Sequence, residues 1–181
     1  MLCGIDEAGR GCLAGPLVVA GVILKESVEG LNDSKVLSEK KREVLYEKII
    51  QHSHYEIVFT DNKTIDEIGL SKAIKLSIEQ IVNKLNPKKT IMDGNTTFGV
   101  PNIKAIIKAD ATVSEVSAAS ILAKVSRDRF IVGEDPNYPE YGFAKHKGYG
   151  TKHHVQMIKE HGYCPLHRLS FKLKALQPTL L

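Results

Sequence analysis

Short apolar runs separated by turn residues predict three strands in the first third of the chain. These runs are MLCGID at 1–6, PLVVAGVIL at 16–24 and HYEIVFTD at 54–61. The segment AGRGCLAG at 8–15 contains three glycines and predicts a sharp turn. A sharp turn with a strand on each side indicates that the first two strands pair antiparallel.

Apolar residues at helical spacing predict helices over 114–131 and 151–162, and two more that start at Ser38 and Thr64. Ser38 and Thr151 are suitable N-cap residues. Thr64 and Glu67 fit a capping box, and Asn86-Pro87 is expected to stop the helix that it opens.

Two further strands are expected in the second half of the chain. TIMDG at 90–94 predicts a short strand that ends in a turn, and NIKAIIKAD at 102–110 predicts a strand that ends at an acid. DPNYPEYGF at 135–143 predicts a loop. Neighbouring strands early and strand–helix alternation later indicate an α/β fold, a mixed sheet with helices on its faces.

Composition changes this picture little but excludes several protein classes. The chain has 181 residues, 43% of them apolar and 25% charged, which is ordinary for one globular domain. No apolar run approaches the roughly 20 residues that span a bilayer, and the polar start does not fit a signal peptide. We therefore expect a cytoplasmic protein without a membrane partner, with its three cysteines reduced. The net charge of +4 permits a polyanionic partner.

Acidic residues follow apolar runs at three expected strand ends: Asp6-Glu7, Asp93 and Asp110. An acid in such a place is costly unless a cation or hydrogen bonds compensate it. Singly, Asp110 also fits a helix cap and Asp93 an Asx-turn. Carboxylates without histidine or cysteine partners favour Mg²⁺ or Mn²⁺. Because neighbouring strand residues face opposite ways, Asp6 and Glu7 share a site only if the strand ends or bulges there.

Two segments suit the binding of a nucleic acid. Gly9, Arg10 and Gly11 offer close backbone approach and a guanidinium for phosphate, although the dinucleotide pattern GxGxxG is not met. Tyr149, within the basic run KHKGY, either stacks on a base or sugar or is a half-buried loop residue. Basic groups near Lys35 and at 40–42 either contact phosphate or form a solvated helix start. The histidines lack the spacing of a structural zinc site.

Motifs along the whole chain point to one family. The first is GIDEAGRG at 4–11. The others are, in order, NDSK with LS and KR at 32–42, MDG at 92–94, KAD at 108–110, SAASILAKV with RD at 117–128, HKGYGT at 146–151 and HRLSF at 167–171. In this order they resemble the motifs of type 2 ribonuclease H, the ribonuclease HII family. Cys12, where a proline is frequent, and Ala109, where a glycine is usual, are small departures beside the acids.

The resemblance implies a ribonuclease H-like α/β fold, with a catalytic domain over 1–150 and a small C-terminal helical region over 151–181. By motif match, Asp6, Glu7, Asp93 and Asp110 are the catalytic, metal-binding acids. Gly9, Arg10 and Gly11 sense the 2′-hydroxyl and nearby phosphates, and Tyr149 packs on the junction sugar. Lys35 is implied as a further substrate contact.

The resemblance also implies an activity. The expected enzyme is a monomeric endonuclease that uses two Mg²⁺ or Mn²⁺ ions on RNA–DNA hybrids and on duplex DNA with single ribonucleotides, leaving 3′-hydroxyl and 5′-phosphate ends. Three alternatives stay open at this point: a type 3 ribonuclease H, a metal-independent hydrolase with a carboxylate pair, and a nucleic-acid-binding module without catalysis.

Overall fold

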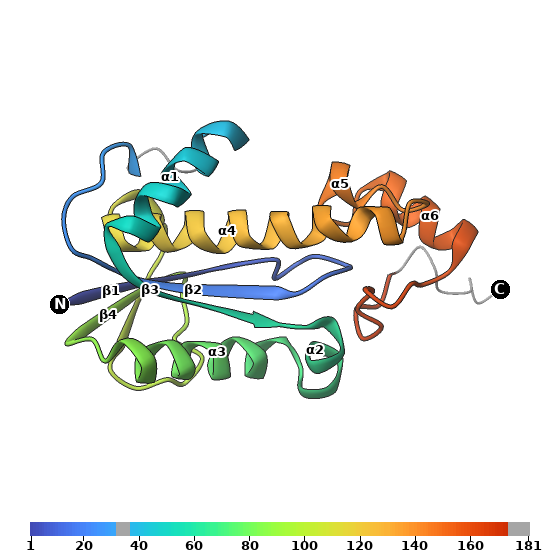
Figure 1. Cartoon of the computed structure of the whole chain (residues 1–181). Coiled ribbons are helices and arrows are strands. Elements are labelled where there is room, and N and C mark those ends of the chain that lie inside the picture. The colour runs from blue at the N-terminus through green and yellow to red at the C-terminus, as the bar shows by residue number, and fades with distance from the viewer. Residues whose placement is uncertain (32–36, 174–181) are drawn as a thin grey trace.

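Five strands form one mixed sheet at the centre of the molecule (Figure 1). The computed structural model describes residues 1–31 and 37–173. The strands are β1 (Leu2–Ala8), β2 (Leu17–Leu24), β3 (Ser53–Thr60), β4 (Lys89–Asp93) and β5 (Ile103–Ile106), in the spatial order β3-β2-β1-β4-β5. The first three pair antiparallel, whereas β4 and β5 run parallel to β1. The predicted α/β class with a mixed sheet is confirmed.

Helices cover both faces of this sheet (Figure 1). One face carries α4 (Ser114–Glu134) and α1 (Glu39–Gln51), and the other carries α3 (Leu70–Leu85) after the short α2 (Asn62–Ile68). The long helix α4 lies close to β1 because Gly4 has no side chain. A Cβ at Gly4 would lie 2.2 Å from backbone atoms of Glu115 and Val116. This close approach brings α4 next to the acids of β1.

The C-terminal part packs around a third apolar cluster at the far end of α4 (Figure 1). This C-terminal part contains the short 3₁₀ turn η3 (Asp135–Asn137), α5 (Phe143–His146) and α6 (Lys152–His161). A second 3₁₀ turn, η2 (Ala109–Ala111), precedes α4 and lies near the sheet. Tyr141 and Phe143 stack in the cluster with ring centroids 5.5 Å apart. Ala14 and Ile131 also belong to it, and the domain boundary at residue 150 stays a prediction.

The helix expected to open at Thr64 is instead two helices. The N-cap of α2 is Asp61, whose carboxylate accepts a hydrogen bond from the Thr64 backbone N–H at 2.7 Å. Gly69, with φ of 83°, separates α2 from α3. Asp61 caps a backbone N–H at the start of α2, and the positive φ of Gly69, which glycine adopts easily, breaks the chain between the two helices.

The strand expected over 102–110 is too long. It stops at Ile106, which pairs with the last residue of β4, Asp93. The chain then turns through Lys108 in the left-handed region, at φ of 59°, into η2. Asp110 therefore lies in a 3₁₀ turn rather than at a strand end. The expected loop over 135–143 also contains structure, since it includes η3 and the first residue of α5.

Among residues 1–31 and 37–173, no helix is both long enough and apolar enough to cross a membrane. The cysteines in these residues, Cys3, Cys12 and Cys164, are buried and form no disulfide.

Candidate active site

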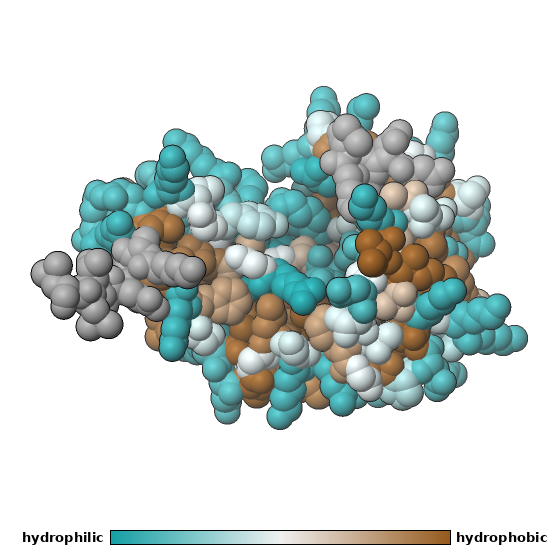
Figure 2. All heavy atoms as spheres, turned by 180° about the vertical axis from the view of Figure 1, so that it is seen from behind, coloured by the Kyte–Doolittle hydropathy of each residue, from teal (hydrophilic) through white to brown (hydrophobic). Residues whose placement is uncertain are grey.

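The four acids meet in one pocket of about 450 Å³. Its lining also includes the residues of the glycine-rich turn, together with Arg42 of α1, Lys124 of α4 and Tyr149. Figure 2 shows a hollow between the part of the molecule that carries α1 and the C-terminal part, bordered by hydrophilic residues. The pocket thus joins acids that are as much as 104 residues apart in sequence, Asp6 and Asp110, with the cations Arg10, Arg42 and Lys124.

The end of one strand ladder opens the pocket beside Asp6 and Glu7. The pairing of β1 with β4 stops at Ile5, whereas its pairing with β2 continues in regular register to Ala8. We predicted that Asp6 and Glu7 share a site only if the strand ends or bulges there. This condition is wrong, because both residues line the pocket although β1 continues regularly past them to Ala8. Both side chains reach the pocket at the edge of β1 that β4 no longer covers.

The other two acids are brought together by a hydrogen bond between their segments. Asp93 ends β4, and its Oδ1 accepts the backbone N–H of Ala109 at 2.7 Å. This bond holds η2 against the end of β4 and places Asp110, the next residue, beside the same pocket. Asp110 is only 2% exposed.

The pocket concentrates negative charge that the protein only partly compensates. Burial raises the pKa of Asp6 to about 8, and the nearby charges of Glu7 and Asp93 add to the rise. Burial also raises the pKa of Glu7, while Arg10, with its Nη1 3.6 Å from a Glu7 oxygen, counteracts the rise. A divalent cation would relieve this repulsion, because it favours the ionised form of every carboxylate around it.

The donor chemistry of the pocket fits a hard cation. Its acidic lining offers carboxylate oxygens alone, without histidine or cysteine, which is the ligand type that Mg²⁺ and Mn²⁺ prefer. In residues 1–31 and 37–173, no group of three or more histidine, cysteine, aspartate or glutamate side chains is already arranged to hold a metal ion. The fit therefore rests on the type and charge of the donors.

A buried arginine that the sequence did not single out supports the glycine-rich turn. Arg127 of α4 is 0% exposed and donates to the carbonyl oxygens of Pro16, Ala14 and Lys147, at 2.9, 2.9 and 2.7 Å. A Cβ on Gly9, which has φ of 86°, would lie 2.0 Å from Arg127 Nε. The turn thus rests directly on this guanidinium, which also links it to the segment before Tyr149.

A second buried arginine supports the turn from the C-terminal part. Arg168 is 1% exposed and donates to the carbonyl oxygens of Gly15 and Arg10, at 3.1 and 3.2 Å. Its guanidinium also lies over the Phe171 ring, 5.0 Å from the centroid. Two charged side chains from distant motifs therefore fix the backbone on which Arg10 is presented.

Tyr149 lies at the edge of the pocket between two cations. Its ring is 40% exposed, with Lys124 Nζ 5.3 Å and Arg127 Cζ 5.7 Å from the centroid. Lys124 also forms an ion pair with Asp128 at 2.9 Å. Burial, followed by the neighbouring Cys12, raises the pKa of Tyr149. The predicted substrate contact Lys35 lies outside the described residues.

Comparison with known proteins decides the family. A model of the family described as Ribonuclease HII matches residues 3–174. The chain belongs to the ribonuclease HII family. Ribonuclease HII of Aliarcobacter butzleri is 62% identical over 177 residues, covering 97% of this chain and 92% of that protein. Ribonuclease HII of a Sulfurovum species is 53% identical over 180 residues, covering 99% and 96%.

Solved structures agree with this ribonuclease HII assignment. The structure of a PCNA:RNase HII complex from Archaeoglobus fulgidus matches with a TM-score of 0.84 and 30% identity, over 99% of this chain and 98% of that chain. A structure of Bst-RNase HIII in complex with Mn²⁺ matches with a TM-score of 0.69 and 17% identity, over 94% of this chain and 66% of that one, which shows a shared fold alone.

The family settles the class of enzyme. A member of the ribonuclease HII family is a ribonuclease H endonuclease, which hydrolyses phosphodiester bonds. This finding excludes the binding module without catalysis and the type 3 ribonuclease H. The dependence of the hydrolysis on a metal ion belongs to the proposal below. The choice of substrate and the ends that are produced belong to the proposal below.

Proposed function

We propose that this ribonuclease H cuts the RNA strand of RNA–DNA hybrids and nicks duplex DNA at single embedded ribonucleotides, leaving 3′-hydroxyl and 5′-phosphate ends. The observation that carries the proposal is the pocket itself. It brings Asp6, Glu7, Asp93 and Asp110 together with the glycine-rich turn and Tyr149. The acids suit a metal-assisted hydrolysis, and the turn and Tyr149 suit recognition of a sugar–phosphate backbone.

The four acids are the residues that would hold Mg²⁺ or Mn²⁺. When bound there, such ions activate a water and stabilise the charge of a phosphodiester under attack. The protein's own part is to supply carboxylates at fixed places on β1, β4 and η2. Lys124 and Arg42 line the same pocket and add positive charge that attracts a phosphate backbone.

The glycine-rich turn is proposed to select RNA by its 2′-hydroxyl, the group that DNA lacks. At Gly11 a Cβ would meet no atom within 4 Å, so the fold itself leaves room for a side chain there. Packing within the protein therefore does not require glycine at this position. A close approach of the substrate backbone would require it. Arg10, whose side chain is 52% exposed, can reach a phosphate from the same turn.

Tyr149 is proposed to pack on the sugar at the junction between ribonucleotide and DNA. The residue is 40% exposed at the pocket edge, and its ring can offer a flat apolar face beside Lys124, which lines the same pocket and attracts phosphate. Few of these contacts would carry base information, so we expect weak sequence preference. Lys35 stays a proposed phosphate contact on the strength of its motif.

The deciding experiment uses a DNA duplex with one ribonucleotide, incubated with the protein in Mg²⁺, Mn²⁺ or EDTA. The proposal expects one nick beside the ribonucleotide with either metal, none with EDTA, and product ends that a ligase and a phosphatase identify as 3′-hydroxyl and 5′-phosphate. Cleavage in EDTA contradicts the metal dependence. Cleavage of a hybrid without any cleavage of this duplex contradicts the proposed nicking at single ribonucleotides.

We further propose that the protein works as a monomer in the cytoplasm. The buried cysteines Cys3, Cys12 and Cys164, none of them in a disulfide, support a reducing compartment. Sedimentation of the protein alone tests the monomer, and a stable dimer would contradict it.

A further inference from the structure

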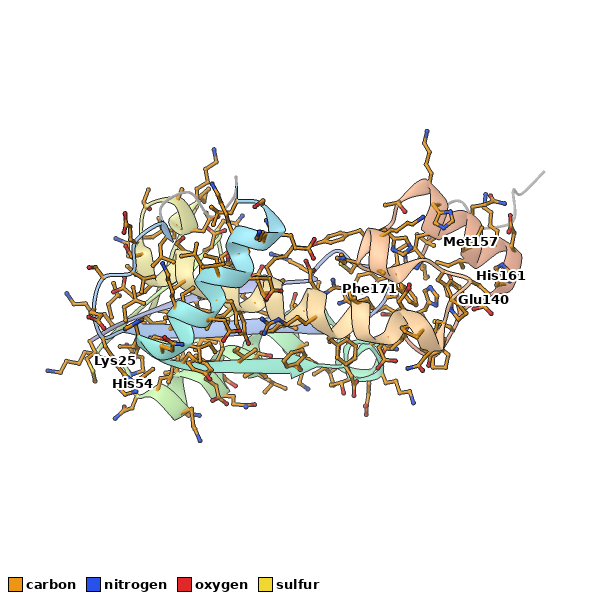
Figure 3. All side chains as sticks on the ribbon, turned by 45° about the horizontal axis from the view of Figure 1, so that its top comes forward. Lys25, His54, Glu140, Met157, His161 and Phe171 are labelled. Atoms are coloured by element: carbon orange, nitrogen blue, oxygen red, sulfur yellow. The ribbon has the colours of Figure 1, made fainter. Side chains whose placement is uncertain are left out.

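Three histidines are buried in the C-terminal part, away from the acidic pocket. His146, His154 and His167 are 9%, 0% and 1% exposed. The rings of His146 and His154 stack with centroids 4.2 Å apart, and Phe143 packs its edge against both. Figure 3 shows that Met157 and His161, on the same helix as His154, lie at the end of the molecule far from Lys25 and His54. None of the three buried histidines lines the pocket.

The hydrogen bonds assign the proton on each ring of a chain that runs from Cys164 to Tyr149. The backbone N–H of Cys164 donates to His167 Nδ1 at 2.8 Å, so neutral His167 carries its proton on Nε2. That Nε2–H donates to His154 Nε2 at 3.0 Å. His154 must then carry its proton on Nδ1, which donates to the carbonyl oxygen of Tyr149 at 2.8 Å. Every donor in the chain faces an acceptor.

Both backbone polar groups of Tyr149, its N–H and its carbonyl oxygen, are hydrogen-bonded to neighbouring residues of this part. The Tyr149 carbonyl also accepts the backbone N–H of Thr151, the N-cap of α6, at 2.8 Å. The Tyr149 N–H donates to the carbonyl of His146 at 2.9 Å. His146 Nδ1 accepts the N–H of Gly148 at 3.1 Å, while its Nε2–H donates to the Tyr141 carbonyl at 2.7 Å.

We propose that His154, oriented by His167, is a positioning residue that fixes the backbone of Tyr149 and so sets the preference of the enzyme for a ribonucleotide junction. This inference rests on the proposed role of Tyr149 in the function above. His154 does not line the pocket that holds the acids. It acts through one hydrogen bond, and His167 acts by holding His154 in the tautomer that makes this bond.

The choice of residues argues for positioning over packing. The surrounding cluster is apolar, with Ile131, Phe143 and Ile158 buried in it. Apolar residues would fill the same space without the cost of burying polar nitrogens. A fully satisfied polar chain does what apolar packing cannot, because each bond has a direction and the last one is aimed at a particular carbonyl.

The test compares His154→Asn with His154→Gln in the full-length protein. The amide of Asn reaches the place of Nδ1 and can donate to the Tyr149 carbonyl, whereas Gln reaches the place of Nε2 and fills more of the ring volume. The measured quantity is the ratio of cleavage rates on a duplex with one ribonucleotide and on an RNA–DNA hybrid, with kcat and KM for each. We expect His154→Gln to lower this ratio roughly tenfold and His154→Asn to keep most of it.

Two further variants make the result interpretable. Tyr149→Ala should lower the same ratio at least as much as His154→Gln, and His153→Ala, on the exposed side of α6, should leave it unchanged. If Tyr149→Ala leaves the ratio unchanged, the proposed role of Tyr149 fails. If Tyr149→Ala lowers it while Asn and Gln at position 154 behave alike, or Gln keeps more than Asn, the positioning role of His154 is overturned.

A second pair keeps the inference testable if a His154 variant does not fold. His167→Gln can still donate to His154 Nε2, whereas His167→Leu leaves the His154 tautomer unspecified. The expected result is a cleavage ratio near that of the unaltered protein for His167→Gln and a lower one for His167→Leu. Equal ratios in the two folded variants contradict the proposal.

Discussion

The acidic pocket and the histidine chain are both buried polar groups, but their electrostatics are opposite. In the pocket, burial and neighbouring negative charge raise the pKa of Asp6 to about 8. In the C-terminal part, burial lowers the pKa of both His154 and His167 to about 4, so both rings stay neutral at physiological pH. The pocket contains charges that repel one another, whereas each imidazole in the chain faces a partner.

This difference distinguishes a site that carries out a reaction from a network that holds the site in place. A group of like charges held together by the fold costs stability, and a ligand of opposite charge can repay that cost. A satisfied neutral network costs little and needs no ligand, so its use lies in fixing geometry. Buried polar groups that the protein leaves in mutual repulsion therefore mark the reaction site, and satisfied ones mark its scaffold.

The strongest challenge to this comparison is the variant Asp6→Asn. We expect cleavage in Mg²⁺ to fall on the order of 10³-fold or more, because a ligand of the catalytic ions is lost. The free energy of unfolding, measured in EDTA at pH 7, should be equal or higher, because a buried carboxyl that is repelled by Glu7 has been removed. Near-normal turnover, or a large loss of stability, would mean that Asp6 supports the fold and is not a ligand of the catalytic ions.

Two glycines in one turn sharpen the same distinction. Gly9→Ala should destabilise the protein by about 3 kcal/mol, since its Cβ would meet Arg127 Nε at 2.0 Å and the Pro16 carbonyl oxygen at 2.7 Å. Gly11→Ala should leave the free energy of unfolding unchanged but reduce cleavage roughly tenfold, through lost approach of the substrate. Denaturant unfolding and cleavage rates of both variants show whether the two glycines have different roles. Matching effects of the two substitutions would show that the turn has one role throughout.

Acid should weaken the histidine chain. The folded pKa of His154 and of His167, about 4, lies below the ordinary value of 6.5, so the unfolded chain binds protons that the folded one does not. The free energy of unfolding is therefore unaffected by protonation of these rings above pH 6.5 and falls as the pH falls from 6.5 towards 4. The loss is about 2 kcal/mol per imidazole at pH 5. Denaturant unfolding at pH 7 and pH 5 should show a smaller fall in the double variant His154→Gln with His167→Gln. An equal fall in both proteins would mean that these rings are charged or exposed in the folded state.

Asp6 should respond to pH in the opposite sense. Its folded pKa of about 8 lies above its ordinary value of 3.8, so its ionisation penalises the folded state above pH 8 and the penalty shrinks as the pH falls from 8 towards 4. In EDTA, Asp6→Asn should therefore gain more stability over the unaltered protein at pH 8 than at pH 5. A gain that does not change with pH would contradict the raised pKa.

Much of the site could be predicted from local sequence, because its acids belong to short motifs that follow apolar strands. Asp93 does end a strand, as its apolar run indicated. The position of Asp110 was less predictable. The strand before it, β5, ends at Ile106 because its partner β4 ends at Asp93, and the local sequence pattern does not show where a partner strand ends. The break of the helix at Gly69 was not predicted, because apolar residues continue at helical spacing on both sides of this glycine.

The scaffold of the site could not be predicted in the same way. Charged residues are rarely fully buried, so sequence alone would leave Arg127 and Arg168 on the surface. All but one of their partners are carbonyl oxygens more than 100 residues away, which no local pattern reveals. His154 and His167 lie 13 residues apart without metal-ligand spacing, and their relation depends on which nitrogen carries the proton.

Binding of Mn²⁺ to the protein, measured by calorimetry at pH 7 in two buffers of different ionisation enthalpy, tests the central claim most directly. We expect Mn²⁺ to bind and to displace about one proton, the one that Asp6 holds with its pKa of about 8. Asp6→Asn should bind more weakly and release no such proton. Mn²⁺ affinity and proton release that are the same in both proteins would contradict the claim that these acids form a cation site.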